Sequence, residues 1–162
     1  MAETQTPVDK VKEKFPSSIL DVATFRDELT VTVAKRDLCE ICNFLYSDPD
    51  LQYRFLIDLC GVDFLPEIPR FQVVYFLYSM KNGQRLRLKV RVAEGESITS
   101  VESIWKAANW LEREVYDLFG ISFENHPDLR RILLWDGYEG HPLRKDYPVE
   151  GPDFDKPFVL EV

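Results

Sequence analysis

Two cysteines, Cys39 and Cys42, have the C-x-x-C spacing that structural zinc sites and thiol redox enzymes share. A structural zinc site needs four ligands, but the sequence has no second pair of this kind, and neither His126 nor His141 has a partner at ligand spacing. Cys42 also lies on the apolar stripe of a predicted helix, where cysteine packs as a small hydrophobic residue. We therefore predict core packing for this pair, with a thiol oxidoreductase as the alternative.

Other catalytic patterns are absent from the sequence. It contains no nucleophile elbow, Walker A loop, dinucleotide-binding glycine motif or zinc-protease helix motif. His126 and His141 each precede a proline, which favours backbone bonding or partner contact over catalysis. Glu112 and Glu114 lie two apart on a predicted helix and so point to different faces, where they are expected to face solvent or form salt bridges. The sequence predicts no catalytic, cofactor-binding or metal site in this chain.

Two basic pairs, Arg130-Arg131 and Arg144-Lys145, stand out in a chain with a net charge of −8. Leucines and prolines flank both pairs. Because the planar guanidinium of arginine suits carboxylates at protein interfaces, the pattern favours binding to a partner protein over a solvated charged surface.

Composition limits the classes of function. With 162 residues, 45% of them hydrophobic, the chain is expected to fold as one domain with a core. The acidic balance disfavours binding to nucleic acid or to an anionic membrane, and no stretch approaches a membrane span. Three cysteines without an export signal indicate a reducing compartment, so a cytoplasmic or peripheral location is expected.

Hydrophobic periodicity predicts an ordered series of elements through residue 92. A short helix at 8–15 precedes strands at 19–22 and 29–33, and a helix at 38–46 follows a capping pair of Asp37 and Glu40. Three more strands are expected at 54–60, 71–79 and 85–92, the last two joined in a hairpin by Asn82-Gly83.

Two capping patterns predict a pair of helices after the last of these strands. Thr99 with Glu102 indicates one helix, and Asn109 with Glu112 indicates a second that ends at Gly120. The series as a whole predicts an α+β fold, with a mostly antiparallel sheet and helices packed on it.

The character of the chain changes after Gly120. Residues 121–162 contain five of the ten prolines and many apolar side chains, yet no sustained periodicity. Such a long structureless stretch is uncommon inside a domain. We therefore predict a compact domain at 1–120 and an extended C-terminal arm at 121–162 that docks on a partner subunit.

Three blocks of this sequence, Asn109–Ile121, His126–Leu134 and Gly140–Pro148, together resemble the 30 kDa subunit, also called the C subunit, of NADH:quinone oxidoreductase (respiratory complex I). The blocks keep that family's order and spacing, whereas residues 1–108 agree mainly in the order of elements. The signature is also similar to that of related subunits in membrane-bound hydrogenases and in the photosynthetic complex I relative, so the electron donor stays open.

The resemblance implies a non-catalytic scaffold subunit of the peripheral arm, which supports electron transfer from NADH to quinone coupled to proton translocation. NADH, FMN, iron–sulfur clusters and quinone are then bound by other subunits, and this chain holds none of them. The expected partners are the quinone-site subunit of the 49 kDa type and neighbouring cluster-bearing subunits. The expected location is the cytoplasmic side of the bacterial cell membrane, peripheral through the complex.

The resemblance also implies roles for residues at matching positions. A structural motif is expected at Glu112, Arg113, Glu114, Tyr116, Asp117, Phe119 and Gly120. A partner interface is expected at Arg130, Arg131, Pro142, Leu143, Arg144, Lys145, Asp146 and Tyr147.

Overall fold

The centre of the fold is a hairpin of two long strands, β4 (Phe71–Ser79) and β5 (Gln84–Val92). Leu86, Leu88 and Val90 of β5 are buried, as their alternation predicts, and Leu88 pairs with Tyr75 of β4. Three further strands, β1 (Ile19–Phe25), β2 (Glu28–Val33) and β3 (Phe55–Asp63), complete the sheet in the order β1-β2-β5-β4-β3. Every neighbouring pair is antiparallel except β2 with β5. The computed structural model describes residues 6–150. Its elements are α1 (Pro7–Lys14), β1 (Ile19–Phe25), β2 (Glu28–Val33), a 3-10 turn (Lys35–Asp37), α2 (Leu38–Ser47), β3 (Phe55–Asp63), β4 (Phe71–Ser79), β5 (Gln84–Val92), β6 (Ser97–Thr99), α3 (Ala108–Phe119) and β7 (Ser122–Glu124).

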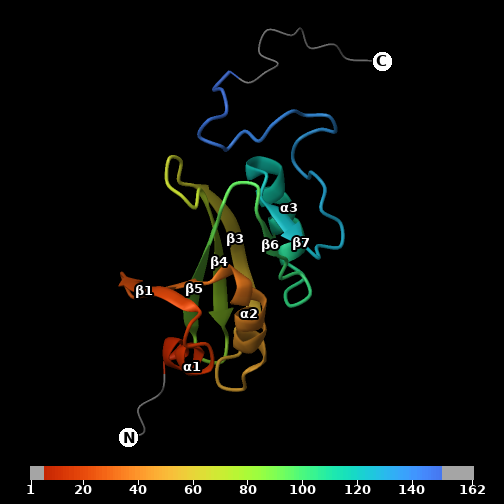
Figure 1. Cartoon of the computed structure of the whole chain (residues 1–162). Coiled ribbons are helices and arrows are strands. Elements are labelled where there is room, and N and C mark those ends of the chain that lie inside the picture. The colour runs from red at the N-terminus through yellow and green to blue at the C-terminus, as the bar shows by residue number, and fades with distance from the viewer. Residues whose placement is uncertain (1–5, 151–162) are drawn as a thin grey trace, which may run out of the picture.

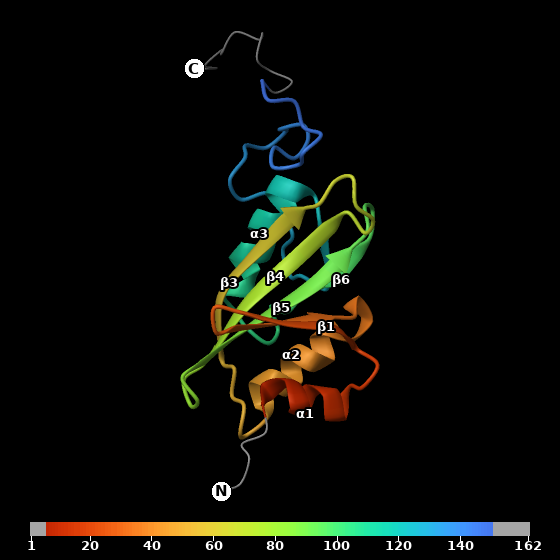
Figure 2. The same ribbon diagram turned by 90° about the vertical axis from the view of Figure 1, so that its left-hand side faces the viewer.

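Helices α2 and α3 cover one face of this sheet. Figure 1 shows both on the same side of β3, β4 and β5, and Figure 2, which looks at the opposite side, shows these strands with α3 behind them. The core between the two layers contains Ile41 and Leu45 of α2, Val115 of α3 and Tyr75 of β4. The fold is therefore α+β with a mostly antiparallel sheet, as predicted.

Helix α3 packs closely against β3 because Gly61 has no side chain. A Cβ atom at Gly61 would lie 2.8 Å from Cδ2 of Phe119. The sequence predicts a strand at 54–60 that stops before Gly61, whereas β3 continues to Asp63. This extension matters because it places the carboxylate of Asp63 at the end of the strand that lies closest to the C-terminal part of the chain.

The two hairpin turns depend on positive φ angles. Gly83 has φ +62° in the turn between β4 and β5, as the hairpin prediction requires, while Asn82 is not among the positive-φ residues. Arg26 and Asp27 have φ +51° and +63° in the two-residue turn between β1 and β2. Both angles are what a tight turn between twisted antiparallel strands demands.

The predicted cap at Asp37 is not formed. Its carboxylate makes no hydrogen bond to the first amides of α2, and instead accepts from Oγ of Ser18 at 2.6 Å and from Nε of Arg36 at 3.0 Å. The chain enters α2 through a 3-10 turn, so Asp37 lacks the extended backbone of a capping residue. A capping box that we did not predict, Thr6 with Asp9, begins α1.

The prediction of a helix that begins near Thr99 is wrong. Thr99 ends β6, and residues 102–104 and 106–107 form turns. The amide of Ser100 donates to the carbonyl of Glu124 at 2.9 Å, and the amide of Val101 donates to the carboxylate of Glu112 at 2.8 Å. The predicted capping box needs the amide of Glu102 to donate to the hydroxyl of Thr99, but that amide donates to Oγ of Ser100 at 3.1 Å. Tertiary contacts to Ser100 and Val101 therefore override the local capping pattern.

Only the second helix of the predicted pair exists, and its cap also differs from the prediction. Helix α3 begins at Ala108, so Asn109 lies inside it and does not cap it. Its end agrees with the prediction: Gly120 has φ +73°, the left-handed conformation that commonly stops a helix.

The first residues of the predicted arm fold with the domain. Ile121 and Phe123 are 2% and 3% exposed and belong to the core, and β7 pairs in parallel with β6. The stretch that follows the last strand therefore starts at residue 125. The arm residues at 151–162, which include Pro152 and Pro157, lie outside the described residues.

Candidate interaction site

Residues 125–150, here called segment 125–150, cross the end of α3 and the adjacent end of the sheet (Figure 1). None of these residues is fully buried, although Leu129 packs against the core, so apolar packing contributes less here than in the domain. The main hydrogen bonds and ion pairs that attach the segment lie at three places: the carboxylate of Asp117, the C-terminal end of α3, and a buried pair of Arg70 and Asp63.

The carboxylate of Asp117, fully buried on α3, binds the first part of the segment. Its Oδ2 accepts the successive amides of Ile132, Leu133 and Leu134 at 3.0, 2.8 and 2.9 Å, and its Oδ1 accepts Nη1 of Arg131 at 2.7 Å. Burial raises the pKa of Asp117, but these donors together outweigh burial and hold the pKa below its ordinary value. An ionised carboxylate therefore sits in a nest of amides at neutral pH.

Side chains also bind backbone carbonyls between α3 and the segment. Arg113 donates from Nε to the carbonyl of Arg130 and from Nη2 to that of Arg131, both at 3.1 Å. Nε2 of His126 lies 3.0 Å from the carbonyl of Asn109. These contacts give His126 the backbone-bonding role that the sequence predicts.

The C-terminal end of α3 is capped by two side chains of the segment. Nδ1 of His141 lies 2.8 Å from the carbonyl of Asp117, and Nε of Arg144 donates to the carbonyl of Phe119 at 2.6 Å. Carbonyls at a helix end lack partners within the helix, and a cation there complements the helix dipole. Gly120 leaves room for both, because a Cβ atom there would lie 2.5 Å from Nη2 of Arg144 and from Nε2 of His141.

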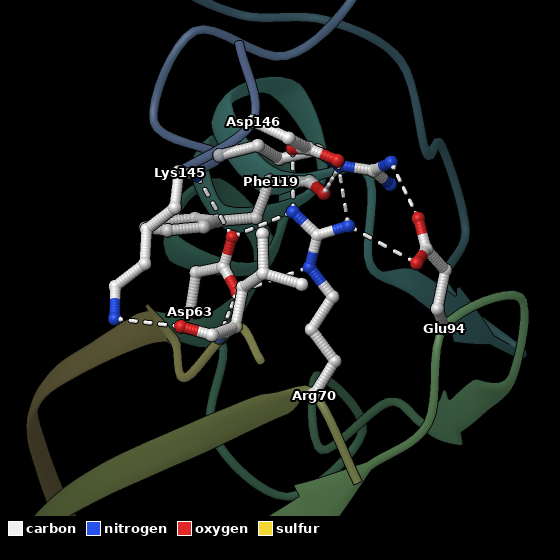
Figure 3. Close-up of polar contacts among 8 residues, drawn as sticks. Asp63, Arg70, Glu94, Phe119, Lys145 and Asp146 are labelled. Atoms are coloured by element: carbon white, nitrogen blue, oxygen red, sulfur yellow. Dashed lines mark hydrogen bonds and ion pairs between the residues drawn. The ribbon is translucent and has the colours of Figure 1, made fainter. Parts of the chain in front are cut away.

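Arg70 lies at the centre of the third attachment (Figure 3). Its Nε and Nη2 donate to the two oxygens of Asp63 at 3.0 and 2.8 Å, and both side chains are buried. Arg70 also reaches Asp146 at 2.9 and 2.5 Å and Glu94 at 3.0 Å. Hydrogen bonds from Arg70 hold the pKa of Asp63 well below its ordinary value, although burial opposes them.

Residues 144–146 each add a contact to this attachment. The amide of Lys145 donates to Oδ2 of Asp63 at 2.9 Å, and its ammonium donates to the carbonyl of Leu65 at 3.2 Å. Nη1 of Arg144 donates to the carboxylate of Glu94 at 3.1 Å, and the carboxylate of Asp146 accepts a hydrogen bond from Nη2 of Arg70. Hydrogen bonding to Arg70 lowers the pKa of Asp146. Charged groups of the segment and of the domain thus hold the segment against the strand ends.

The predicted interface residues fall into two groups. Arg131, Arg144, Lys145 and Asp146 contact the domain of their own chain, as described above. Arg130 has a largely exposed side chain that pairs with Asp128 at 2.8 Å. Contact of either group with a partner remains a prediction, but the first group has an intramolecular role that the sequence did not predict.

Of the remaining interface residues, Pro142 and Tyr147 are half-buried and Leu143 is exposed. The hydroxyl of Tyr147 lies 2.6 Å from that of Tyr138. Leu133, Trp135 and Leu143 are 61%, 62% and 52% exposed. These three residues, here called the apolar surface of the segment, project from backbone that polar contacts hold in place.

Glu112 corrects the prediction that it faces solvent or forms a salt bridge. It is fully buried, and its carboxyl accepts from Oγ of Ser100 at 2.5 Å and from the amide of Val101 at 2.8 Å. Burial raises its pKa to about 7. The spacing argument holds for Glu114, which lies two residues further along and is exposed. In the same helix, the ring of Tyr116 meets His141 edge-on at 6.3 Å.

The cysteines have the properties of packed residues. Cys42 is buried, and burial raises the pKa of its thiol; burial also raises the pKa of Cys39 and of Cys60. A raised pKa lowers the fraction of reactive thiolate. Within residues 6–150, no group of three acidic, cysteine or histidine side chains could hold a metal ion, and no helix is long and apolar enough to cross a membrane.

Sequence analysis missed Arg70, Asp63 and Glu94. The signal available was faint: Asp63 and Arg70 are charged residues at the two ends of a proline-containing loop, each next to an apolar strand. Burying a charged side chain at such a position costs free energy unless it has a partner of opposite charge, so two such residues of opposite sign indicate a pair. Nothing in the sequence, however, indicates that the third member of the cluster is Asp146.

The fold and the site define a class of protein: an α+β domain whose own C-terminal segment is fixed to it by buried charged groups and presents an apolar surface outward. The sequence matches the family described as "Respiratory-chain NADH dehydrogenase, 30 Kd subunit" over residues 31–153. The chain is 58% identical to the NADH-quinone oxidoreductase C subunit of Geobacter metallireducens and 57% identical to that of Geobacter sulfurreducens, with 94% of each chain covered in both cases.

Solved structures agree with this assignment. A trypsin-resistant fragment (1-134) of Nqo5 is 33% identical, with a TM-score of 0.67 over 76% of this chain and all of that fragment. A membrane-bound sulfane sulfur reductase, an archaeal respiratory membrane complex, contains a chain that is 23% identical, with a TM-score of 0.73 over 88% of this chain and 84% of that one. The second likeness concerns the fold alone. The chain belongs to the family of the 30 kDa subunit of respiratory-chain NADH dehydrogenase.

Proposed function

We propose that this chain is a scaffold subunit in the peripheral arm of an NADH:quinone oxidoreductase, and that it binds the quinone-site subunit through the apolar surface of segment 125–150. The observation that carries the proposal is the exposure of Leu133, Trp135 and Leu143 on a segment that is itself fixed by charged contacts. Exposed apolar groups on a fixed backbone favour association, because little conformational entropy is lost on binding.

The proposed contribution of the chain is geometric. Electrons pass between NADH, FMN, iron–sulfur clusters and quinone in other subunits, and this chain keeps the quinone-site and cluster-bearing subunits in register. Partial burial of Cys39 and full burial of Cys42 raise the pKa values of both thiols, which argues against a thiol oxidoreductase using this pair. The proposed location is the cytoplasmic side of the cell membrane, peripheral through the complex.

An equivalent role in a membrane-bound hydrogenase or in the photosynthetic complex I relative is the second candidate. The structural likeness to a chain of a sulfane sulfur reductase complex favours keeping it, because it shows that the same fold occurs in another respiratory membrane complex. Mass spectrometry of the native complex distinguishes the two, since a flavin-bearing subunit and a hydrogenase subunit differ in mass and sequence.

The experiment that tests the proposal removes the apolar surface and leaves the anchors. We expect Leu133→Ala with Trp135→Ala to lower co-purification of the quinone-site subunit with the tagged chain by tenfold or more. Met80→Ala, which removes an equally exposed apolar side chain in the turn between β4 and β5, is the matched control and should have no effect. Equal co-purification of both variants with the quinone-site subunit would refute the proposal.

Limited proteolysis adds a second readout. The Nqo5 fragment is described as trypsin-resistant and covers 76% of this chain. We expect trypsin to cut the isolated chain after Arg130 before it cuts in the domain, because the side chain of Arg130 is largely exposed. We expect assembly to protect that site, because Arg130 precedes Leu133 of the apolar surface by only three residues. Cleavage at the same rate in the complex and in the isolated chain would show that this surface stays exposed to solvent after assembly, and would contradict the proposal.

A further inference from the structure

A row of four cations lies on the face of the sheet that α2 and α3 leave uncovered. Leu86, Leu88, Val90 and Val92 of β5 point toward the helices, so the alternate residues point to the opposite face, which Figure 2 shows toward the viewer. These residues, here called the basic row, are Arg85, Arg87, Lys89 and Arg91.

The basic row is only half neutralised within the described residues. Arg87 pairs with Glu28 and Arg91 pairs with Glu67. Arg85 and Lys89 form no ion pair within residues 6–150. In addition, Nε of Arg87 and Nη1 of Arg91 are buried N–H groups that have no acceptor in this part of the chain. In a chain with a net charge of −8, this surface therefore has unused donors and uncompensated positive charge.

A hollow of about 240 Å³ lies at one end of the row. Ile57, Phe76 and Leu77 form its apolar wall, and Arg85 and Arg87 line its side. The guanidinium of Arg87 lies 5.0 Å from the ring centre of Phe76. The volume is below the usual range of small-molecule sites, which starts at roughly 300 Å³, but suits one large side chain that anchors a protein segment.

From this arrangement we infer that the uncovered face binds an acidic segment of a neighbouring subunit, with one large apolar side chain in the hollow and carboxylates on the basic row. Successive cations are about 7 Å apart along the strand. Carboxylates two residues apart on a strand, or four apart on a helix at about 6 Å, match that spacing. Glu28 and Asp58, which also line the hollow, would repel a continuous polyanion such as nucleic acid, whereas separate carboxylates can avoid them.

This docking surface is distinct from the apolar surface of segment 125–150, and it rests on the proposed function only because another subunit must supply the acidic segment. The two failures are distinguishable. If the chain were absent from the native complex, the proposed function would fail. If the chain were present but its uncovered face contacted no acidic segment, only the present inference would fail.

Photo-cross-linking in the assembled complex tests the contact directly. A photoreactive benzoylphenylalanine is placed at Phe76, in the wall of the hollow, and at Lys12, an exposed residue of α1, as the matched control. We expect the Phe76 probe alone to attach to another subunit, on a peptide that has at least two Asp or Glu residues near an apolar one. A basic peptide, residues 151–162 of this chain, lipid, or no product above the control would each overturn the inference.

Charge reversal provides an independent test. Arg85→Glu with Lys89→Glu changes the two unpaired cations of the row, and we expect retention of the chain in the complex to fall about tenfold at physiological salt. Lys12→Glu with Lys106→Glu makes the same change in net charge at exposed positions and should leave retention unchanged. Equal retention of both double variants, with both isolated chains folded by circular dichroism, would also overturn the inference.

Discussion

The α+β domain and segment 125–150 are held by different forces. The domain has a continuous core of apolar side chains, among them Tyr75, Val90 and Val115, whereas the segment contains no buried residue. The segment depends on three attachments made of carboxylates, guanidinium groups and backbone amides. Apolar burial is insensitive to pH, but charged hydrogen bonds exist only while their carboxylates are ionised.

This contrast means that the two regions should respond oppositely to acid. The pKa values of Asp63, Asp117 and Asp146 at the attachments are lowered, so their stabilising contribution is present above about pH 4 and is lost as the pH falls further. The pKa of Glu112 in the domain is raised, so its stabilising contribution has the opposite pH dependence and is lost as the pH rises. Acidification should therefore release the segment while the domain is still folded.

The largest expected effect comes from the group that joins the two regions. Arg70→Met leaves Asp63 buried without its cation and removes the partner of Asp146, so we expect a loss of about 4 kcal/mol in the free energy of unfolding. Urea denaturation at pH 7 measures it. Lys106→Met, which breaks an exposed pair with Glu102, is the control and should cost less than about 0.5 kcal/mol. Similar losses in both would show that burial of the Arg70 pair is not what matters.

The next effect concerns the domain alone and depends on pH. Because the pKa of Glu112 rises from 4.5 to about 7 on folding, the folded chain retains a proton there that the unfolded chain loses. The contribution of Glu112 to stability is therefore greatest below about pH 4.5 and falls as the pH rises through 7. Glu112→Gln cannot ionise, so its stability relative to wild type should increase by about 3 kcal/mol between pH 4 and pH 8.

Thermal or urea unfolding of both proteins across this pH range provides the measurement. Glu114→Gln, a matched change at the exposed position on the same helix, should show no such trend. A stability difference between wild type and Glu112→Gln that does not vary with pH would mean that Glu112 keeps an ordinary pKa.

A smaller effect is confined to the segment. Asp117→Asn removes the charge that binds Arg131 and the amides of residues 132–134, so we expect local opening there to become easier by about 2 kcal/mol. Hydrogen exchange at these amides should accelerate roughly 30-fold, while exchange in β4 stays unchanged. Asp128→Asn, at an exposed carboxylate, is the control. Faster exchange throughout the domain would indicate that segment and core unfold as one unit.

The smallest effect is expected from the cysteines. Cys39→Ala with Cys42→Ala should cost about 1 kcal/mol, because only Cys42 is buried, and should leave quinone reduction by the assembled complex intact. Turnover of the purified complex measures this. Complete loss of turnover with the complex fully assembled would support thiol chemistry instead.

Local chemistry made much of the domain predictable. The alternation along β5, the Asn82-Gly83 turn, the apolar stripe of α2 and the stop at Gly120 all agree with the structure, because each depends on residues that are close in sequence. The helix predicted at Thr99 failed for the complementary reason. Its capping pattern was local, but the amide of Glu102 that it required donates to Ser100, and Ser100 is held by Glu112 and Glu124 from further along the chain.

The sequence by itself determined the family, the α+β class and the positions of most strands, since periodicity and motif spacing are properties of neighbouring residues. Tertiary structure alone decided that Arg131, Arg144 and Asp146 bind their own domain, and that Glu112 is buried. Lys145 and Asp63, for example, meet across 82 positions of the chain. A contact over such a separation depends on how the layers pack, and leaves no periodic trace in the sequence.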